Sequence, residues 1–279
     1  MTVGLRRSLL FVPATNARAL EKARTLACDA VIIDLEDSVG PQDKDQARDA
    51  AIAAIKDGFG EREVALRVNG LDTPWGQADL KAAAFGGVGI VVLPKVSSPE
   101  TVLAVARGIG ERVELWAMIE SCMGVLRLAD IAATAKTAPL GALMVGANDL
   151  AAEMRCRLTP GREALVTALS QTVIAARAFG LMPLDSTYTD FQDASGFEDQ
   201  CRQGVELGFD GKSLIHPSQI EPANRLFSPT SERIAWARGV IAAFEAEPGA
   251  GVLSVDGRMV ERLHLKEAQR VAAFALAAG

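Results

Sequence analysis

The chain has 279 residues, of which 49% are hydrophobic and 23% are charged, so it has enough apolar material for a large core and is neither disordered nor fibrous. Its 29 basic and 35 acidic residues give a formal net charge of −6 without any dense block of lysine and arginine, which excludes nucleic acid as an expected partner. The first apolar stretch is only about five residues long, too short for an export signal or a membrane span. The four cysteines form no C-x-x-C pair, so we expect reduced thiols in a cytoplasmic protein.

Eight short apolar runs, rich in β-branched residues, recur along the chain with room for a helix between them. They are SLLFV (8–12), AVIID (30–34), VALRV (64–68), GIVVL (89–93), VELWAMI (113–119), ALMVG (142–146), LMPLD (181–185) and GKSLI (211–215). The segments between them are alanine-rich with helical spacing, and several end in glycine, a common helix stop. Strands that alternate with helices predict right-handed βαβ units and a parallel sheet.

Eight such units in about 215 residues match the length of a closed (β/α)8 barrel, whose strands are nearly continuous apolar runs because both faces are covered. The main alternative is a doubly wound open sheet, but no G-x-G-x-x-G follows the first run. We therefore predict a (β/α)8 TIM barrel over 1–228. The tail, 229–279, predicts a helix with a serine cap, a glycine-rich turn or short hairpin, and a closing helix that pack on the barrel or on a neighbouring subunit.

Barrel enzymes place their active sites at the C-terminal ends of the strands, so the residues after each run are the candidates. These are Asp34, Glu36, Asp37, Arg67, Asn69, Lys95, Glu120, Asn148, Asp149, Asp185 and His216. The chain has only two histidines, so its chemistry must rest on carboxylates, arginines and lysines. For His216, which precedes a proline, we expect hydrogen bonding in the core or within a loop, with catalysis as the alternative.

Glu120 and Asp149 follow two consecutive runs, so they should meet at one point on the barrel edge. Paired carboxylates without histidine or cysteine suit a hard divalent ion, above all Mg²⁺, with Mn²⁺ as a second candidate. Asp149 is also the first residue of the segment DLAAEM, which is expected to be helical. The sequence therefore leaves open that Asp149 serves only as an N-cap.

Arg67 ends an apolar run, and because burial cannot neutralise a guanidinium, it needs an anion. That anion is either a ligand oxygen or an internal carboxylate, Asp34 or Glu36, and both remain open. The backbone N–H groups of 146–149, at a helix start, offer a site for a small carboxylate. Lys95 could form a Schiff base, although an ion pair with neighbouring acids is favoured.

Several longer fragments resemble one known family, in order and over almost the whole chain. They are RSLLFVPATNARALEKA, VIIDLEDSV, LRVNG, VVLPKV, MIES, GANDLAAEM, GFDGKSLIHPSQI and GRMVERLHLKEAQ. Together they resemble the citrate lyase β-subunit-like proteins, which include malyl-CoA and citramalyl-CoA lyases. The resemblance implies a (β/α)8 barrel, Mg²⁺, and cleavage or formation of the C–C bond between an acyl thioester and a small 2-oxo acid.

Carried over position by position, the resemblance implies that Glu120 and Asp149 bind the metal and that Arg67 holds the thioester carbonyl and enolate oxygen. Lys22 is similar in position to the basic residue that meets the CoA phosphates, with Arg18 as a weaker candidate. The other expected site residues are Gly146, Ala147 and Asn148 at the substrate carboxylate, and Asp34, Glu36, Asp37 and Lys95 in support.

Two positions depart from the family pattern. In the lyases the closing segment usually reads M-[IV]-D, and its aspartate reaches into the neighbouring subunit's site to move the proton on the enolate carbon. Here Glu261 occupies that position, and the extra methylene lengthens its reach by about 1.5 Å. Asn148 stands where many relatives carry glutamate, which removes one negative charge beside the metal.

The sequence therefore predicts a Mg²⁺-dependent lyase for a malyl-, methylmalyl- or citramalyl-CoA type thioester, formed from an acyl-CoA enolate and a 2-oxo acid. The alternatives are a thioesterase or malate-synthase-like activity on the same thioesters, and a β-subunit of a citrate lyase complex that acts on an acyl carrier protein. We expect a homotrimer or hexamer with Glu261 contributed across the interface, and no membrane partner.

Overall fold

The structure is a computed structural model that describes residues 5–110 and 112–277. The described residues form two compact units, a barrel over Arg6–Asn224 and a C-terminal unit over 225–277, with which Leu5 is grouped.

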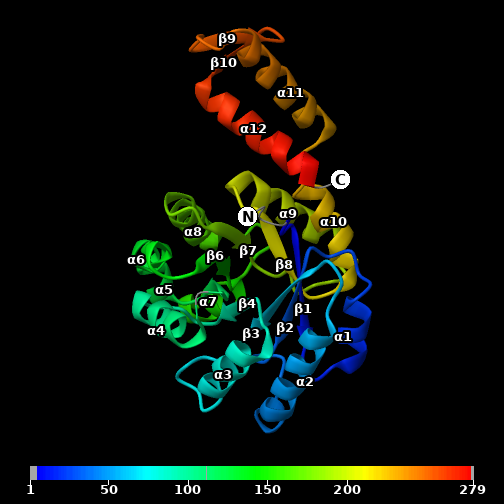
Figure 1. The fold of residues 1–279 in the computed structure, drawn as a ribbon, viewed down its shortest axis with the longest axis vertical. Coiled ribbons are helices and arrows are strands. Elements are labelled where there is room, and N and C mark those ends of the chain that lie inside the picture. Colours follow the sequence, from blue (N-terminus) through cyan, green and yellow to red (C-terminus); the bar gives the residue numbers. More distant parts are fainter. Residues whose placement is uncertain (1–4, 111, 278–279) are drawn as a thin grey trace. The chain divides into compact units, whose positions relative to one another are not determined.

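Eight parallel strands close into a barrel in chain order, as the sequence predicts (Figure 1). They are β1 (Ser8–Pro13), β2 (Ala30–Asp34), β3 (Glu63–Arg67), β4 (Ile90–Leu93), β5 (Glu114–Ile119), β6 (Leu140–Val145), β7 (Met182–Asp185) and β8 (Gly211–Leu214). β8 pairs with β1 and so completes the closure. The apolar runs form strands because helices cover their outer face and the barrel interior covers the other.

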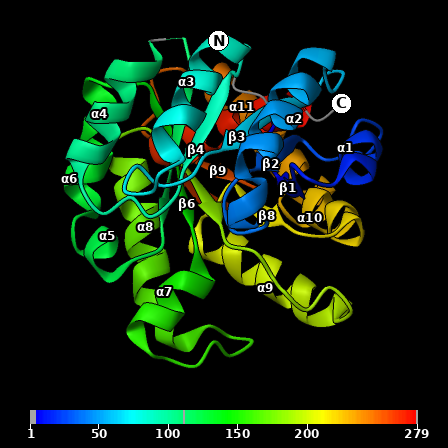
Figure 2. The same cartoon turned by 90° about the horizontal axis from the view of Figure 1, so that it is seen from below.

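The helices form a ring around the strands (Figure 2). They are α1 (Ala17–Ala23), α2 (Lys44–Asp57), α3 (Gly76–Gly86), α4 (Pro99–Ile109), α5 (Cys122–Leu126), α6 (Leu128–Ala133), α7 (Ala147–Met154), α8 (Val166–Ala178), α9 (Ala194–Leu207) and α10 (Ile220–Leu226), with short 3₁₀ helices η1 (Pro41–Asp43), η2 (Thr134–Lys136), η3 (Glu163–Leu165) and η4 (Pro217–Gln219). β5 and β6 are each followed by an additional short helix, α5 and α7, before the next long segment. These additions lie where the sequence predicts the metal carboxylates.

Apolar side chains at alternate strand positions fill the barrel interior. The buried members are Leu9, Ala30, Ile32, Ala65, Ile90, Val92, Trp116, Met118, Ala142, Met144 and Leu184. Because strand side chains alternate with a period of two, the residues two positions beyond Ile32, Ala65 and Met118 also point inward. These are Asp34, Arg67 and Glu120, so the apolar rows end in charged groups at the C-terminal end of the barrel.

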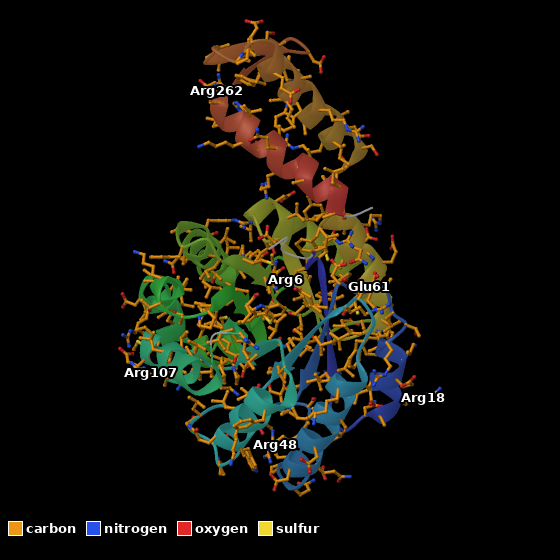
Figure 3. All side chains as sticks on the ribbon, in the orientation of Figure 1. Arg6, Arg18, Arg48, Glu61, Arg107 and Arg262 are labelled. Atoms are coloured by element: carbon orange, nitrogen blue, oxygen red, sulfur yellow. The ribbon has the colours of Figure 1, made fainter. Side chains whose placement is uncertain are left out.

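Arg6 closes the opposite, N-terminal end of the barrel. Its guanidinium pairs with Glu63 at 2.6 Å and Glu114 at 2.7 Å, and lies 4.9 Å from the ring centre of Trp116. Figure 3 labels this residue. The two ends of the barrel therefore both carry buried charges, but with different partners.

The C-terminal unit contains α11 (Ser231–Ala246), a hairpin of β9 (Val252–Val255) and β10 (Arg258–Glu261), and α12 (Arg262–Ala277). The predicted helix, hairpin and closing helix are all present. The cap of α11 is Thr230, whose side chain accepts a hydrogen bond from the Arg233 N–H, and not the predicted serine. Asp256 and Gly257 both have positive φ, 48° and 73°, as the tight turn of a hairpin requires.

No helix in the described ranges combines the length and apolar character that crossing a bilayer requires. The four cysteines, all described, are free thiols. Burial raises the pKa of Cys201 to about 12 and also raises the pKa of Cys28. These two buried thiols are therefore poor nucleophiles.

Candidate functional site

A cavity of about 380 Å³ opens at the C-terminal ends of the strands. It is lined by Phe11, Pro13, Asp34, Asp37, Ser38, Arg67, Met118, Glu120, Val145, Gly146, Ala147, Asn148, Asp149, Thr187, Thr189, Ser213 and Ile215. Four carboxylates and one guanidinium are the charged groups of this lining among the residues described. The excess of negative charge favours a bound cation.

Glu120 is the most buried carboxylate on the β5 side of the cavity, with 3% of its surface exposed. Its Oε1 accepts a hydrogen bond of 2.6 Å from the Lys95 N–H, and its Oε2 lies against Gly146, where an added Cβ would be only 2.1 Å away. Burial raises the pKa of Glu120 to about 7, and the negative charges of Glu36 and Asp149 act in the same direction. A cation between Glu120 and Asp149 would relieve this repulsion.

Asp149 lies in the first turn of α7 and faces the same cavity. The N-cap of α7 is Gly146, so the alternative that Asp149 serves as the N-cap is wrong. Within the described ranges, its carboxylate makes no hydrogen bond or ion pair with another side chain. Asp149 is thus free to bind a cation, as the chemistry of a metal ligand requires.

Arg67 is held by a set of carboxylates from the loop after β2. Its Nε and Nη2 donate to the two oxygens of Asp34 at 2.6 and 2.7 Å, and its Nη1 lies 3.0 Å from Glu36 Oε2 and 3.4 Å from Asp37 Oδ2. Burial alone would lower the pKa of Arg67, but the hydrogen bonds and charge of Asp34 raise it. The internal ion pair left open by the sequence is therefore present, and the same guanidinium also lines the cavity.

Lys95 supports the site from outside the cavity lining. It adopts a left-handed conformation with φ 52°, its N–H donates to Glu120, and its Nζ pairs with Glu36. Burial tends to lower the pKa of Lys95, but the hydrogen bond and charge of Glu36 raise it overall. A lysine held protonated in this way is a poor nucleophile, so the geometry favours the ion pair over the Schiff base.

Lys44, which the sequence did not single out, connects the two loops that carry the Arg67 cluster. Its Nζ donates to the carbonyls of Leu35 and Glu36, both at 2.8 Å, and to Asn69 Oδ1 at 2.6 Å. Asn69 in turn donates from its N–H and its amide to Asp79. Lys44 is buried by contacts between segments that are distant in the chain, so no local sequence pattern could have indicated it.

The remaining predicted residues are not among those that line the cavity. Arg18 and Lys22 are exposed on α1 without an ion pair to the part of the chain described, and Figure 3 shows Arg18 projecting outward. Glu261 lies in β10 of the C-terminal unit, where its N–H donates to His264 Nδ1 at 2.9 Å. His216 caps η4, in agreement with its expected loop role.

No three or more His, Cys, Asp or Glu side chains come together to hold a metal within 5–110 and 112–277. A cation at Glu120 and Asp149 would thus take its other ligands from water or substrate, as Mg²⁺ commonly does.

The sequence pattern described as HpcH/HpaI aldolase/citrate lyase matches residues 7–217. The chain belongs to this family. A (3S)-malyl-CoA thioesterase of Cereibacter sphaeroides is 45% identical over 96% of this chain and 94% of its own length. The citrate lyase subunit beta of Escherichia coli K12 is 36% identical over 92% of this chain and 88% of its own length.

Two solved structures of the family resemble this fold and contain bound ligands. Protein CitE of Mycobacterium tuberculosis in complex with magnesium, acetoacetate and coenzyme A has 32% identity and a TM-score of 0.81, over 98% of this chain and 97% of that chain. The citrate lyase beta subunit of the same organism, complexed with oxaloacetate and magnesium, has 32% identity and a TM-score of 0.70, over 81% and 97%. The chain is therefore an enzyme of the citrate lyase β and malyl-CoA lyase type.

Proposed function

We propose that the enzyme is a Mg²⁺-dependent C–C lyase that cleaves or forms a malyl-, methylmalyl- or citramalyl-CoA type thioester from an acyl-CoA enolate and a small 2-oxo acid. The observation that carries this proposal is the meeting of Arg67 with Glu120 and Asp149 on one small cavity. The magnesium, oxaloacetate and coenzyme A bound by the related structures support it.

The donor set fits Mg²⁺, because both groups are carboxylates and the more buried one has a pKa raised by burial and by neighbouring negative charge. When bound there, Mg²⁺ would act as a Lewis acid and template for the carboxylate and carbonyl oxygens of the 2-oxo acid. Glu120 and Asp149 would hold it.

In the cleavage direction the 3-hydroxyl gives its proton to water and becomes the carbonyl of the 2-oxo acid, and the electron pair of the broken C2–C3 bond moves into the thioester as an enolate. Arg67 would stabilise the enolate oxygen with a positive charge whose orientation Asp34 and Glu36 fix in advance. The backbone N–H groups of 147–149 would orient the substrate carboxylate. The enolate carbon then accepts a proton, which releases the acyl-CoA.

We assign that proton transfer to Glu261 of a neighbouring subunit in a homotrimer or hexamer. Two sets of exposed apolar side chains support such an assembly: Leu126 and Met154 on α5 and α7 of the barrel, and Met259 and Leu263 on either side of Glu261. Exposed apolar surface of this kind is typical of a protein–protein contact. Pairing of the two sets would bring Glu261 to the edge that carries the metal carboxylates.

Hydrolysis of the same thioester is the second candidate, because the relative with 45% identity is a (3S)-malyl-CoA thioesterase. Water would then attack the thioester carbonyl, and Arg67 would stabilise the oxyanion of the tetrahedral intermediate instead of an enolate. The two activities share their binding groups and differ in the bond that breaks. A carrier-protein thioester is the corresponding alternative for the substrate, since citrate lyase beta subunits are also related.

The test is incubation of the purified protein with Mg²⁺ and either L-malyl-CoA or citramalyl-CoA, with acetyl-CoA, free CoA and the 2-oxo acid measured together. We expect acetyl-CoA in equal amount to glyoxylate or pyruvate, and loss of both products in Glu120→Ala. Free CoA without the 2-oxo acid would contradict the lyase and establish the thioesterase.

A further inference from the structure

Two apolar side chains of the cavity lining contact the Arg67 guanidinium. Its carbon Cζ lies 4.8 Å from the centre of the Phe11 ring, and its Nη1 lies 3.9 Å from the sulfur of Met118. A guanidinium packs favourably on the face of an aromatic ring. Phe11 and Met118 thus form an apolar wall beside Arg67, which we call the Phe11–Met118 wall.

The barrel interior holds this wall in place. Met118 is 5% exposed and belongs to the apolar cluster inside the barrel, and Phe11 packs against the same cluster. Leu9 and Trp116, which lie two positions earlier on the same two strands, are completely buried. Because protein interiors are close-packed, the wall cannot move deeper into the barrel to make room for a larger ligand.

Arg67 is also fixed in position on the other side of this contact. Its Nε and Nη2 donate to the two oxygens of Asp34 at 2.6 and 2.7 Å, and only 9% of its side chain is exposed. A guanidinium held by two parallel hydrogen bonds keeps its orientation. A group bound to Arg67 therefore lies at a fixed distance from the Phe11–Met118 wall.

The chemistry of an enolate brings the acyl substituent close to this wall. The proposed reaction places the enolate oxygen at Arg67, and the carbon that carries the substituent is bonded directly to the carbon of that oxygen. This substituent is a hydrogen in acetyl-CoA, a methyl group in propionyl-CoA and an ethyl group in butyryl-CoA. An alkyl group among the cavity carboxylates would remove water from charged groups, so it is favoured against the apolar wall.

We propose that the Phe11–Met118 wall limits the length of the acyl group, so that the enzyme accepts acetyl and propionyl thioesters and rejects butyryl and longer ones. This proposal deepens the proposed function and rests on it, because it takes Arg67 as the group that binds the enolate oxygen. The size of the cavity agrees with a short acyl group, since about 380 Å³ is near the lower limit for small-molecule sites.

The experiment measures the condensation of glyoxylate with acetyl-, propionyl- and butyryl-CoA by the full-length protein with Mg²⁺. The variants are Phe11→Ala, Phe11→Leu and Met118→Val, and kcat/KM is obtained from the product thioesters by mass spectrometry. One methylene in an apolar pocket changes kcat/KM by about 10- to 200-fold. We therefore expect the butyryl-to-acetyl ratio of kcat/KM to rise by about 10- to 200-fold in Phe11→Ala, and by less in the two milder variants.

A second readout is the affinity for acetyl- and butyryl-CoA, measured by calorimetry, which should shift toward butyryl-CoA in the same variants. The matched control is Phe59→Leu. The Phe59 ring lies 4.6 Å from Arg24 Cζ, is 2% exposed and is outside the cavity lining. This control removes the same atoms as Phe11→Leu from the same kind of contact, and it should change neither ratio.

An unchanged ratio in all three wall variants, or a wild type that uses butyryl-CoA as well as acetyl-CoA, would overturn the wall. Folded variants that lose activity equally with all three thioesters would show that Phe11 and Met118 only hold Arg67, and would overturn it as well. A wild type that condenses none of the thioesters, but whose wall variants gain affinity for butyryl-CoA, would support the wall and contradict only the lyase. Neither condensation nor a shift in affinity would overturn both.

Discussion

Gly146→Ala tests whether the Glu120 carboxylate holds the metal. Gly146 has φ −105°, a conformation that alanine adopts freely, so the only perturbation is steric. An added Cβ would lie 2.1 Å from Glu120 Oε2 and 2.5 Å from Glu120 Cβ, whereas ordinary contact begins at 3.4 Å. Rotation of the side chain cannot remove the second contact, because the Glu120 Cβ is fixed to the main chain beyond β5. The carboxylate must therefore move by about 1 Å, a displacement that can cost about 100-fold in activity.

We expect the affinity of Gly146→Ala for Mg²⁺, measured by calorimetry, to fall by about 10- to 100-fold. The matched control is Gly141→Ala, whose Cβ would lie 2.1 Å from Glu114 Oε1 at the opposite end of the same strand pair. Both variants should lose about 1–3 kcal/mol of unfolding free energy from overpacking. Only Gly146→Ala should lose Mg²⁺ affinity, and equal affinities in the two variants would refute the assignment of Glu120 as a ligand.

Three further predictions follow from the site and its supports. The variants Glu120→Gln and Glu261→Gln should each be inactive alone, but a mixture of the two should regain about a quarter of wild-type activity after subunit exchange. Activity returns because some sites then combine an intact barrel with an intact Glu261 from the neighbouring subunit. No recovery of activity would refute the contribution of Glu261 in trans. Lys44→Met should lower kcat by at least about 10-fold with little change in KM, because the loops after β2 and β3 then lose the side chain that hydrogen-bonds to both. The control, Arg6→Met, should affect thermal stability alone. Equal kcat values in the two variants would refute the positioning role of Lys44. Burial opposes ionisation of Asp185, but two buried cations lower its pKa, so its stabilising effect should be complete above about pH 4 and disappear as the pH falls through the lowered value. Urea unfolding against pH should therefore show a shallower acid loss in Asp185→Asn, together with a loss of about 3–5 kcal/mol at neutral pH from the unpaired cations, and parallel pH curves would contradict this.

The barrel could be predicted because each strand is a short apolar run in the sequence, which can be recognised locally. Each run is buried on both faces, and the alternation of side chains with a period of two then determines which residue beyond the run points into the cavity. This is why the sequence alone could place Asp34, Arg67 and Glu120 at the C-terminal end of the barrel. It placed Asp149 there as well, but a local pattern could not separate a first-turn position from an N-cap.

The buried polar residues that hold the loops around the cavity could not be predicted. They depend on contacts between distant segments, which no local sequence pattern reveals. Lys44 contacts Asn69 across 25 positions, and Gln219 contacts Tyr188 across 31. Both are polar side chains buried by tertiary packing, where propensity and periodicity give no signal. Thr230 replaced the expected serine as the cap of α11 because adjacent hydroxyl residues compete for one position.

The central claim is that the cavity stabilises an acyl-CoA enolate. The most direct measurement is cleavage of L-malyl-CoA in D₂O with Mg²⁺, followed by mass spectrometry of the thioester products. The account predicts acetyl-CoA that carries one deuterium in its methyl group, equimolar with glyoxylate, because the enolate carbon takes its proton from an exchangeable group. Malate and free CoA as the sole products would contradict it.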